Sequence, residues 1–488
     1  MEKKDLQPQA VFQEFAAINA VPRPSKREEK MIAYLQQWGS SHGLPTKVDE
    51  TGNVLISKPA TPGMENRRTV ILQSHMDMVC DKLVDVDFDF DHDPIRTHIE
   101  GEWLTADGTT LGADDGIGCA IELAILADDS LKHGPIECVF TRDEETGLSG
   151  AEGMKAGFMT GDYLINLDSE DEGQIFVSCA GGRNTTATFR YQRQQAAAGS
   201  FFLTAQLKGL LGGHSGDDID KKRANAIKVL SRFLCQEMSR YGEQVQLCSL
   251  QSGKMHNAIP RDGRFVIAVP TGLKEQVKAD WNIFAAQVED EFHVTDPVMQ
   301  WSMESCEAQT VIDPQVARRM VWALQAVDNG ILAICQDEAL GGMVETSSNV
   351  ASIVTGPTEA VIVSSQRSNV MSNLDNMCAT VRAAYELAGA EVVTGDGYPA
   401  WKMRPESKLT QLVVSTYEEL FGRKPIVRGI HAGLECGLFS ERYPELDMVS
   451  FGPTLRGVHT PDEKLHIPTV DMVWRHLLLV LQRVPEKN

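Results

Sequence analysis

The side chains best suited to chemistry in this sequence are histidines and carboxylates that follow short apolar runs. They are His75, Asp77, Glu144, Glu145, Asp168 and His459. A further stretch, residues 110–118, is rich in glycine and places Asp114 and Asp115 ahead of a helical pattern. Zinc accepts histidine nitrogen and carboxylate oxygen, and paired catalytic zinc ions lie about 3.5–4 Å apart. Two histidines and three acids would be enough for such a pair.

Each of these residues also has an ordinary structural interpretation. Asp114 suits the N-cap of a helix, His75 could be a hydrogen-bonded core histidine, and Glu144-Glu145 could be a solvated turn. Their joint occurrence after successive apolar runs favours a metal site. The spacing of His75 and Asp77 fits a carboxylate that accepts the second ring N–H of a metal-bound histidine. Asp77 would then orient His75 and would not bind metal itself.

The predicted secondary structure would bring these residues together. Apolar strand-like runs alternate with helical patterns in the first third of the chain, which indicates an α/β sheet. The runs that precede the candidate residues cover 69–74, 136–141, 163–167 and 446–451. In open α/β sheets, ligands bind beyond the carboxyl ends of the strands. The sequence therefore predicts one site at that edge of the sheet.

The chain is long enough for two domains. Its 488 residues exceed the roughly 250–300 residues that one hydrophobic core usually serves. Glycines at 181–182 and 395–397 enclose a region with strand and helix signals of its own. We predict a discontinuous α/β domain of residues 1–182 and 397–488 with a domain of residues 183–396 inserted in it. Helices are expected near 407–421 and 470–484.

Composition narrows the possible partners and surroundings. The net charge of −22 opposes binding to nucleic acid and to anionic membranes. No run approaches the roughly 18 apolar residues of a membrane span, and the N-terminus lacks the apolar core of a secretory signal. The ten cysteines form no C-x-x-C pair and are expected to be reduced, with Cys138 and Cys335 in buried apolar runs. We predict a cytoplasmic protein with a small-molecule substrate.

Motifs along nearly the whole chain resemble the metallopeptidases that include peptidase T, carnosinase and carboxypeptidase G. The motifs are Ser74-His75-Met76-Asp77, Gly-Thr-Thr-Leu-Gly-Ala-Asp-Asp-Gly at 108–116, Glu144-Glu145-Thr146-Gly147, Asn166-Leu167-Asp168, Gly212-Gly213-His214-Ser215-Gly216, Asn257-Ala258-Ile259-Pro260, His-Ala-Gly-Leu-Glu-Cys-Gly at 431–437 and His459-Thr460-Pro461-Asp462-Glu463. Two departures, Ile117 for a common lysine and Glu435 for a common aspartate, match the subgroup that cleaves aminoacylhistidine dipeptides. They leave the role of Glu435 open.

The resemblance implies two Zn²⁺ ions per chain, for which Mn²⁺ or Co²⁺ could substitute. Asp114 would bridge the ions, and His75 with Asp168 and Glu145 with His459 would complete the two sites. Glu144 would be the general base that activates a water between the ions. The resemblance also implies a cis peptide bond between Asp114 and Asp115.

For the inserted domain, the resemblance implies an α+β lid that also serves dimerisation. His214, Asn257, Arg367 and His431 would contact the substrate. The alternative is a surface-loop residue for His214, a turn residue for Asn257 and an ordinary surface arginine for Arg367.

The implied activity is hydrolysis of dipeptides, including Xaa-His dipeptides such as carnosine, by a homodimer. One alternative is an N-acyl amino-acid amidohydrolase with the same two-metal chemistry. A more remote alternative is a non-catalytic binding protein on this scaffold, which would usually have lost ligands or the base. The sequence retains the full set, so hydrolysis is favoured.

Overall fold

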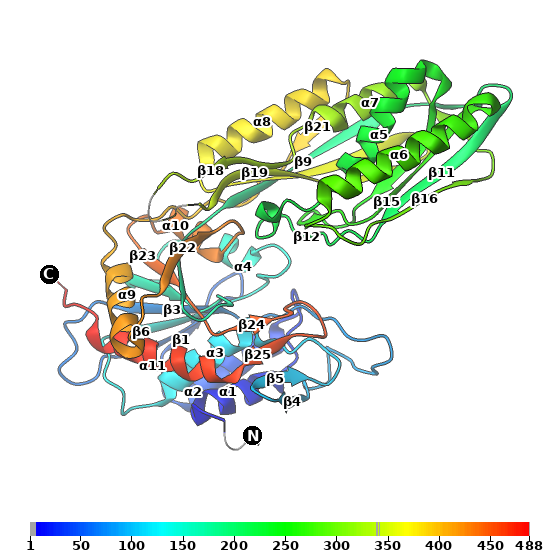
Figure 1. Cartoon of the computed structure of the whole chain (residues 1–488). Helices are drawn as coiled ribbons and strands as arrows, with labels where there is room; N and C mark the ends of the chain where they lie inside the picture. Colours follow the sequence, from blue (N-terminus) through cyan, green and yellow to red (C-terminus); the bar gives the residue numbers. More distant parts are fainter. Residues whose placement is uncertain (1–5, 338–339, 341, 488) are drawn as a thin grey trace. The chain divides into compact units, whose positions relative to one another are not determined.

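A computed structural model describes residues 6–487 except 338, 339 and 341 (Figure 1). The chain divides into two compact units. Unit 1 comprises residues up to 178, 401–429 and 434 onward, and unit 2 comprises 179–400 and 430–433. None of the helices in the described part of the chain combines the length and the apolar composition needed to span a bilayer.

Unit 1 is built around an eight-stranded mixed sheet. Its strands, in spatial order, are β1 (Thr46–Val48), β2 (Val54–Lys58), β6 (Ile136–Thr141), β3 (Val70–His75), β7 (Tyr163–Asn166), β23 (Asp447–Ser450), β8 (Gln174–Cys179) and β22 (Ile426–Ile430). The four central strands β6, β3, β7 and β23 run parallel and are buried at every position. Burial on both faces agrees with the apolar runs in these strands, and buried polar side chains such as Gln73 and Asn166 are hydrogen-bonded to each other. Their carboxyl ends therefore share one edge.

Helices and a small second sheet complete unit 1. The helices are α1 (Gln9–Asn19), α2 (Glu29–Ser41), α3 (Ala113–Ala127), α4 (Ser149–Gly153), α9 (Lys408–Phe421), α10 (Glu435–Arg442) and α11 (Ile467–Arg483). The second sheet has the order β24 (Leu455–Arg456), β25 (Lys464–His466), β5 (Trp103–Ala106) and β4 (Thr97–Glu100). Helix α3 packs on α1 and on β3, and α9 packs on α11. The predicted α/β class and the two C-terminal helices are confirmed.

Unit 2 is an α+β structure with a nine-stranded antiparallel sheet. Its strands are β16 (Gln300–Ser305), β11 (Ser200–Lys208), β15 (Gly263–Pro270), β13 (Gln246–Ser252), β19 (Val344–Thr355), β20 (Glu359–Ser368), β9 (Gly181–Arg190) and β21 (Glu391–Thr394), with β18 (Gly330–Ile334) paired to β19. Two short pairs join β10 (Arg193–Gln194) to β17 (Val311–Ile312) and β12 (Gly213–His214) to β14 (Ala258–Ile259).

Four helices lie along one face of the large unit 2 sheet (Figure 1). They are α5 (Ala226–Tyr241), α6 (Lys274–Phe292), α7 (Pro314–Ala326) and α8 (Met371–Leu387). Phe233, Phe265, Trp281 and Phe284 pack as an aromatic cluster between helices and sheet. Unit 2 therefore has a hydrophobic core of its own, separate from the core of unit 1.

The cysteine prediction holds with one exception. All ten cysteines are free thiols, and Cys138 is buried in β6 as expected. Cys335 is only half-buried, and the β18 strand before it exposes Ile331, Leu332 and Ile334. The apolar run at 331–334 belongs to a strand that pairs only with β19 among the described strands, so its apolar composition does not mark a buried position.

Candidate active site

The central parallel strands place most of the candidate metal-binding residues at one edge of the unit 1 sheet. His75 is the last residue of β3, Glu144 and Glu145 lie in the turn after β6, and Asp168 follows β7. Asp114 comes from the start of α3, and the peptide bond that joins it to Asp115 is cis, as expected.

His459 reaches this edge by a different route from the one expected. The sequence prediction placed it after the strand at 446–451, but it lies in the hairpin between β24 and β25 of the small sheet. Its backbone adopts a positive φ of 64°, which is uncommon for a residue other than glycine. The hairpin therefore delivers His459 from a second sheet.

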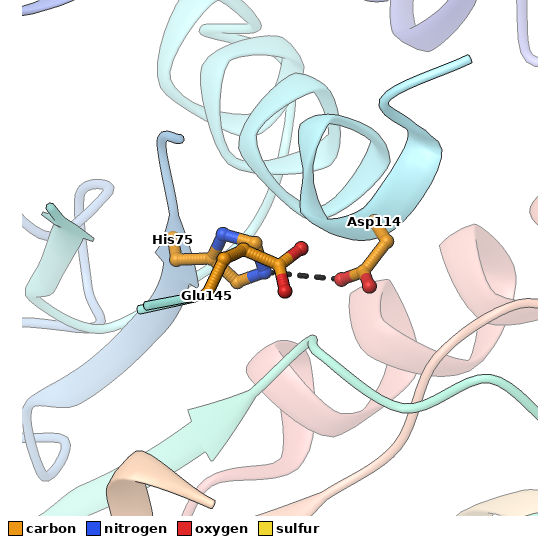
Figure 2. A group of neighbouring side chains, drawn as sticks. All are labelled: His75, Asp114 and Glu145. Carbon is orange, nitrogen blue, oxygen red and sulfur yellow. Dashed lines mark hydrogen bonds and ion pairs between the residues drawn. The ribbon is translucent and has the colours of Figure 1, made fainter. Parts of the chain in front are cut away.

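The carboxylate of Asp114 lies between the two histidines. Its Oδ1 is 3.0 Å from His75 Nε2, and its Oδ2 is 3.0 Å from His459 Nε2. Glu145 Oε2 is 2.9 Å from the same nitrogen of His459, and Asp168 Oδ1 is 3.7 Å from His75 Nε2. Figure 2 shows His75, Asp114 and Glu145 facing one another. All five predicted ligands are thus gathered in one cluster.

Asp77 touches both the histidine and the turn with the two glutamates. Its Oδ1 is 3.3 Å from His75 Nδ1, a charge contact, and His75 Nδ1 has no hydrogen-bond partner among the described residues. The carboxylate accepts hydrogen bonds from the backbone N–H of Glu144 (3.1 Å) and of Glu145 (3.3 Å), and from Ser25 Oγ (2.8 Å). Asp77 therefore fixes the backbone of Glu144-Glu145 as well as facing His75.

The acids raise the proton affinity of both histidines. Burial lowers the pKa of His459, but the carboxylates of Asp114 and Glu145 outweigh it and raise the pKa to about 11. For His75, burial is likewise outweighed by Asp168 and Asp114, and its pKa lies well above the ordinary value. The two histidines in turn hold the pKa of Asp114 below its usual range, against the effect of burial.

The other carboxylates are crowded. Burial, and then Asp114, raises the pKa of Glu145 to about 7, and burial raises that of Asp168 to about 6. Burial and the neighbouring acids raise the pKa of Glu144 well above its usual range. Glu145 Oε1 is buried without a hydrogen-bond partner among the described residues. The ligand atoms of His75, Asp114 and Glu145 lie within 4.8 Å of one another, an arrangement that suits a cation.

The predicted substrate-binding residues form a second cluster within unit 2. Arg367 on β20 is 5% exposed, and its guanidinium lies 3.4 Å from His214 Nε2 and donates to Tyr398 Oη at 2.5 Å. Asn257 joins the cluster because its backbone oxygen accepts from Ser215 N at 2.8 Å. Within the described residues, Arg367 forms no ion pair with a carboxylate.

His431 completes this second cluster. Its Nε2 lies 2.7 Å from Ser347 Oγ, and burial, helped by Arg367 and His214, lowers its pKa to about 3. A Cβ at Gly216 would come within 2.1 Å of the His431 backbone oxygen, so the glycine that ends the Gly-Gly-His-Ser-Gly motif is needed for this approach. The cluster therefore contains both cationic and neutral hydrogen-bond donors.

Sequence reasoning missed two supporting residues of the clusters, Ser25 and Tyr398, and left the role of a third, Glu435, open. Ser25 and Tyr398 lie outside any recognisable motif, and no local signal marks their contacts. Glu435, whose role the sequence left open, is fully buried in unit 1. Its Oε2 accepts from Gln73 Nε2 (2.6 Å) and Thr141 Oγ1 (2.7 Å), and burial raises its pKa to about 8. It supports the ends of β3 and β6.

Comparison with known proteins defines the class to which the fold and the cluster belong. The sequence profile of peptidase family M20/M25/M40 matches residues 71–483. The chain belongs to this family of peptidases, which makes it a hydrolase.

Individual relatives cover the whole chain. Cytosol non-specific dipeptidase of Escherichia coli (strain K12) is 39% identical over 487 residues, with 100% of both chains covered. The crystal structure of aminoacylhistidine dipeptidase from Vibrio alginolyticus has a TM-score of 0.86 and 40% identity, and the match covers 100% of this chain and 99% of that one. Aminopeptidase PepT from Bacillus cereus, at 16% identity and a TM-score of 0.58 over 98% and 99% of the two chains, shares the fold.

The contacts of Glu435 predict different outcomes for two substitutions. Glu435→Gln keeps an oxygen that can accept from Gln73 and Thr141, so its free energy of unfolding should lie within about 1 kcal/mol of the wild-type value. Glu435→Ala leaves both buried donors unpaired and should lower the free energy of unfolding by about 1–3 kcal/mol. Urea unfolding of the metal-free proteins at pH 6.5 measures both values. Equal losses in the two variants would contradict a role as a hydrogen-bond acceptor.

Proposed function

We propose that this chain is a cytoplasmic dipeptidase that holds two divalent metal ions, with zinc as the expected metal, and that it cleaves dipeptides including Xaa-His. The observation that carries the proposal is the position of Asp114, whose two oxygens each face a different histidine. A carboxylate between two ligand sets is the arrangement that paired metal sites use. The family and the named activities of the two full-length relatives support the same function.

The residues fit two divalent cations. His75 and Asp168 would hold one ion, Glu145 and His459 the other, and Asp114 both. The unpartnered Glu145 Oε1 and the raised pKa of Asp168 are features that positive charge would relieve. Nitrogen and oxygen ligands suit zinc but also manganese and cobalt. When bound, such ions supply Lewis-acid chemistry that polarises the scissile carbonyl and makes water more acidic.

Glu144 is assigned as the general base. Its carboxylate would take a proton from the attacking water and deliver it to the leaving amine, which is the usual work of a glutamate beside paired metals. The hydrogen bonds from the Glu144 and Glu145 backbones to Asp77 support separate roles for the two side chains, because they fix the turn from which both project. Asp77 would hold this turn and orient His75.

Arg367 is assigned to the α-carboxylate of the substrate. It is buried without an acidic partner among the described residues, and His214 and Tyr398 contact its guanidinium. A planar guanidinium suits bidentate binding of a carboxylate. Asn257 and His431 would add contacts, and unit 2 would serve as the lid and dimerisation domain of a homodimer. A carboxylate fixed one residue beyond the scissile bond would limit the substrate to dipeptides.

The first prediction concerns metal content. The metal-replete protein should bind about two equivalents of Zn²⁺, and Asp114→Ala should weaken both sites. Loading should weaken as the pH falls, because protons compete for His459, whose pKa is about 11 without metal, and for the other ligands. Titration of the metal-stripped protein with Zn²⁺ at pH 6 and pH 8 measures both effects. Full activity with one equivalent or none would contradict the paired site.

The second prediction separates the adjacent glutamates. Glu144→Gln should keep both metal equivalents and lose about 10²–10⁴-fold in kcat, the usual contribution of a general base. Glu145→Gln should bind less metal. Metal content and kcat are measured on the same preparations, and each variant serves as the control for the other. Normal turnover by Glu144→Gln would exclude it as the base.

The third prediction tests substrate length and the amidohydrolase alternative. The wild type should prefer a Xaa-His dipeptide to its C-terminal amide, to its one-residue extension and to an N-acylhistidine. Leaving a buried arginine unpaired costs about 2–5 kcal/mol. The kcat/KM for the amide should therefore be lower than that for the free acid by a corresponding factor. In Arg367→Ala the difference between acid and amide should disappear.

Arg190→Ala is the matched control for this panel, because Arg190 is an exposed unit 2 arginine paired with Glu359 and Glu391. It should keep the wild-type preferences. Preferential cleavage of the N-acylhistidine would favour the amidohydrolase, and an unchanged acid preference in Arg367→Ala would assign the carboxylate to another residue.

A further inference from the structure

A buried carboxylate outside the metal-binding set holds the loop that carries Asp114. Glu463 is 2% exposed, and its two oxygens accept hydrogen bonds from four consecutive backbone N–H groups. These belong to Leu111 (2.8 Å), Gly112 (3.0 Å), Ala113 (2.8 Å) and Asp114 (3.3 Å).

These N–H groups need an acceptor from elsewhere in the chain. Residues 111–114 are buried, and a buried backbone N–H without a hydrogen-bond partner is costly. Gly112 is left-handed, and Asp114 and Asp115 at the start of α3 do not have helical φ/ψ, so this stretch precedes the regular part of the helix; no side chain of the N-cap residue caps it. Glu463 supplies the missing acceptor from about 350 residues further along the sequence. Arg23 donates to the Gly112 oxygen, so this loop is fixed through both its N–H and its C=O groups.

The hairpin that carries Glu463 also carries His459. It lies between β24 and β25, and β25 pairs with β5 of the small sheet. Gly457 permits the tight hairpin: its φ is +66°, and a Cβ there would lie 2.7 Å from the Asp462 backbone oxygen. One hairpin therefore contacts Asp114 twice, at its backbone through Glu463 and at its side chain through His459.

We propose that Glu463 is a positioning residue for the paired metal site, because its four hydrogen bonds hold Asp114 in place between His75 and His459. The inference rests on the proposed function, in which Asp114 is shared by both ions. Glu463 binds no metal itself, since both of its oxygens are used by the backbone. Supporting residues of this kind commonly contribute 10–100-fold to metal affinity.

Glu463→Gln is the sharpest test. Its amide oxygen could accept from part of the set, but its NH₂ group would oppose the remaining N–H donors. Metal-stripped full-length protein is titrated with Co²⁺, and affinity for each equivalent is read from the visible absorption bands, which report ligand geometry. We expect Glu463→Gln to bind Co²⁺ about 10–100-fold more weakly, with altered bands. Glu463→Asp, which keeps the charge on a shorter side chain, should restore part of the affinity and of the wild-type bands.

Glu137→Gln is the matched control. Glu137 is a buried glutamate of unit 1 that accepts from the backbone N–H of Thr160 (2.8 Å) and Gly161 (3.3 Å), but it lies near the start of β6, away from the metal-binding residues. This variant should lose thermal stability, measured as Tm, while keeping the wild-type Co²⁺ affinity and bands. A loss of Co²⁺ affinity in Glu463→Gln but not in Glu137→Gln would therefore report the positioning of Asp114 and not a general loss of stability.

Each outcome decides the inference. Wild-type Co²⁺ affinity and bands in Glu463→Gln would overturn it, and so would an equal change in Glu137→Gln. If Glu463→Gln does not fold, the Glu463→Asp titration decides, because unchanged affinity and bands there would also overturn the proposal. A wild-type protein that binds fewer than two Co²⁺ ions would instead refute the proposed paired site, so the two failures are distinguishable.

Discussion

Mutual repulsion among carboxylates is the constraint on which the rest of unit 1 depends. Asp114, Glu144, Glu145 and Asp168 are gathered around His75 and His459, which offset part of their charge, and burial strengthens every interaction among them. Burial first, and the neighbouring carboxylates after it, raise the pKa of Glu144, Glu145 and Asp168, which favours protonation of these acids in the absence of metal. A divalent cation relieves the same repulsion without neutralising the base. The fold must therefore hold in place an arrangement that its own charges disfavour.

Backbone hydrogen bonds to two further acids do much of that holding. Asp77 accepts from the N–H groups of the Glu144-Glu145 turn, and Glu463 accepts from those of the loop before Asp114. Arg23 joins the two regions, because it donates to the backbone oxygens of Asp77 and Gly112. The positions of the candidate ligands thus depend on groups that bind no metal, and these groups come from segments far apart in the sequence.

The sequence predicted those parts of the site that follow from local periodicity. The apolar run at 136–141 coincides with β6, and His75 and Asp168 lie at the strand ends that the runs indicated. The hairpin position of His459 was not predicted, because a two-residue strand such as β24 has too short a pattern to recognise. The clamp by Glu463 was also missed, since a contact across about 350 residues leaves no periodic signal. Motif resemblance named the candidate ligands and substrate-binding residues, but only the three-dimensional structure shows which of their atoms meet.

The acidic cluster of unit 1 favours cations, and the cluster around Arg367 in unit 2 favours anions. This difference bears on how substrate specificity could change. Unit 1 gathers acids and would attract cations, whereas the unit 2 cluster gathers Arg367, His214 and His431, and no carboxylate in the described part of the chain pairs with the arginine. Each cluster belongs to a unit with its own sheet, and unit 2 also has its own hydrophobic core. The residues that would carry out hydrolysis and those that would bind the substrate carboxylate therefore come from separately packed units of the chain.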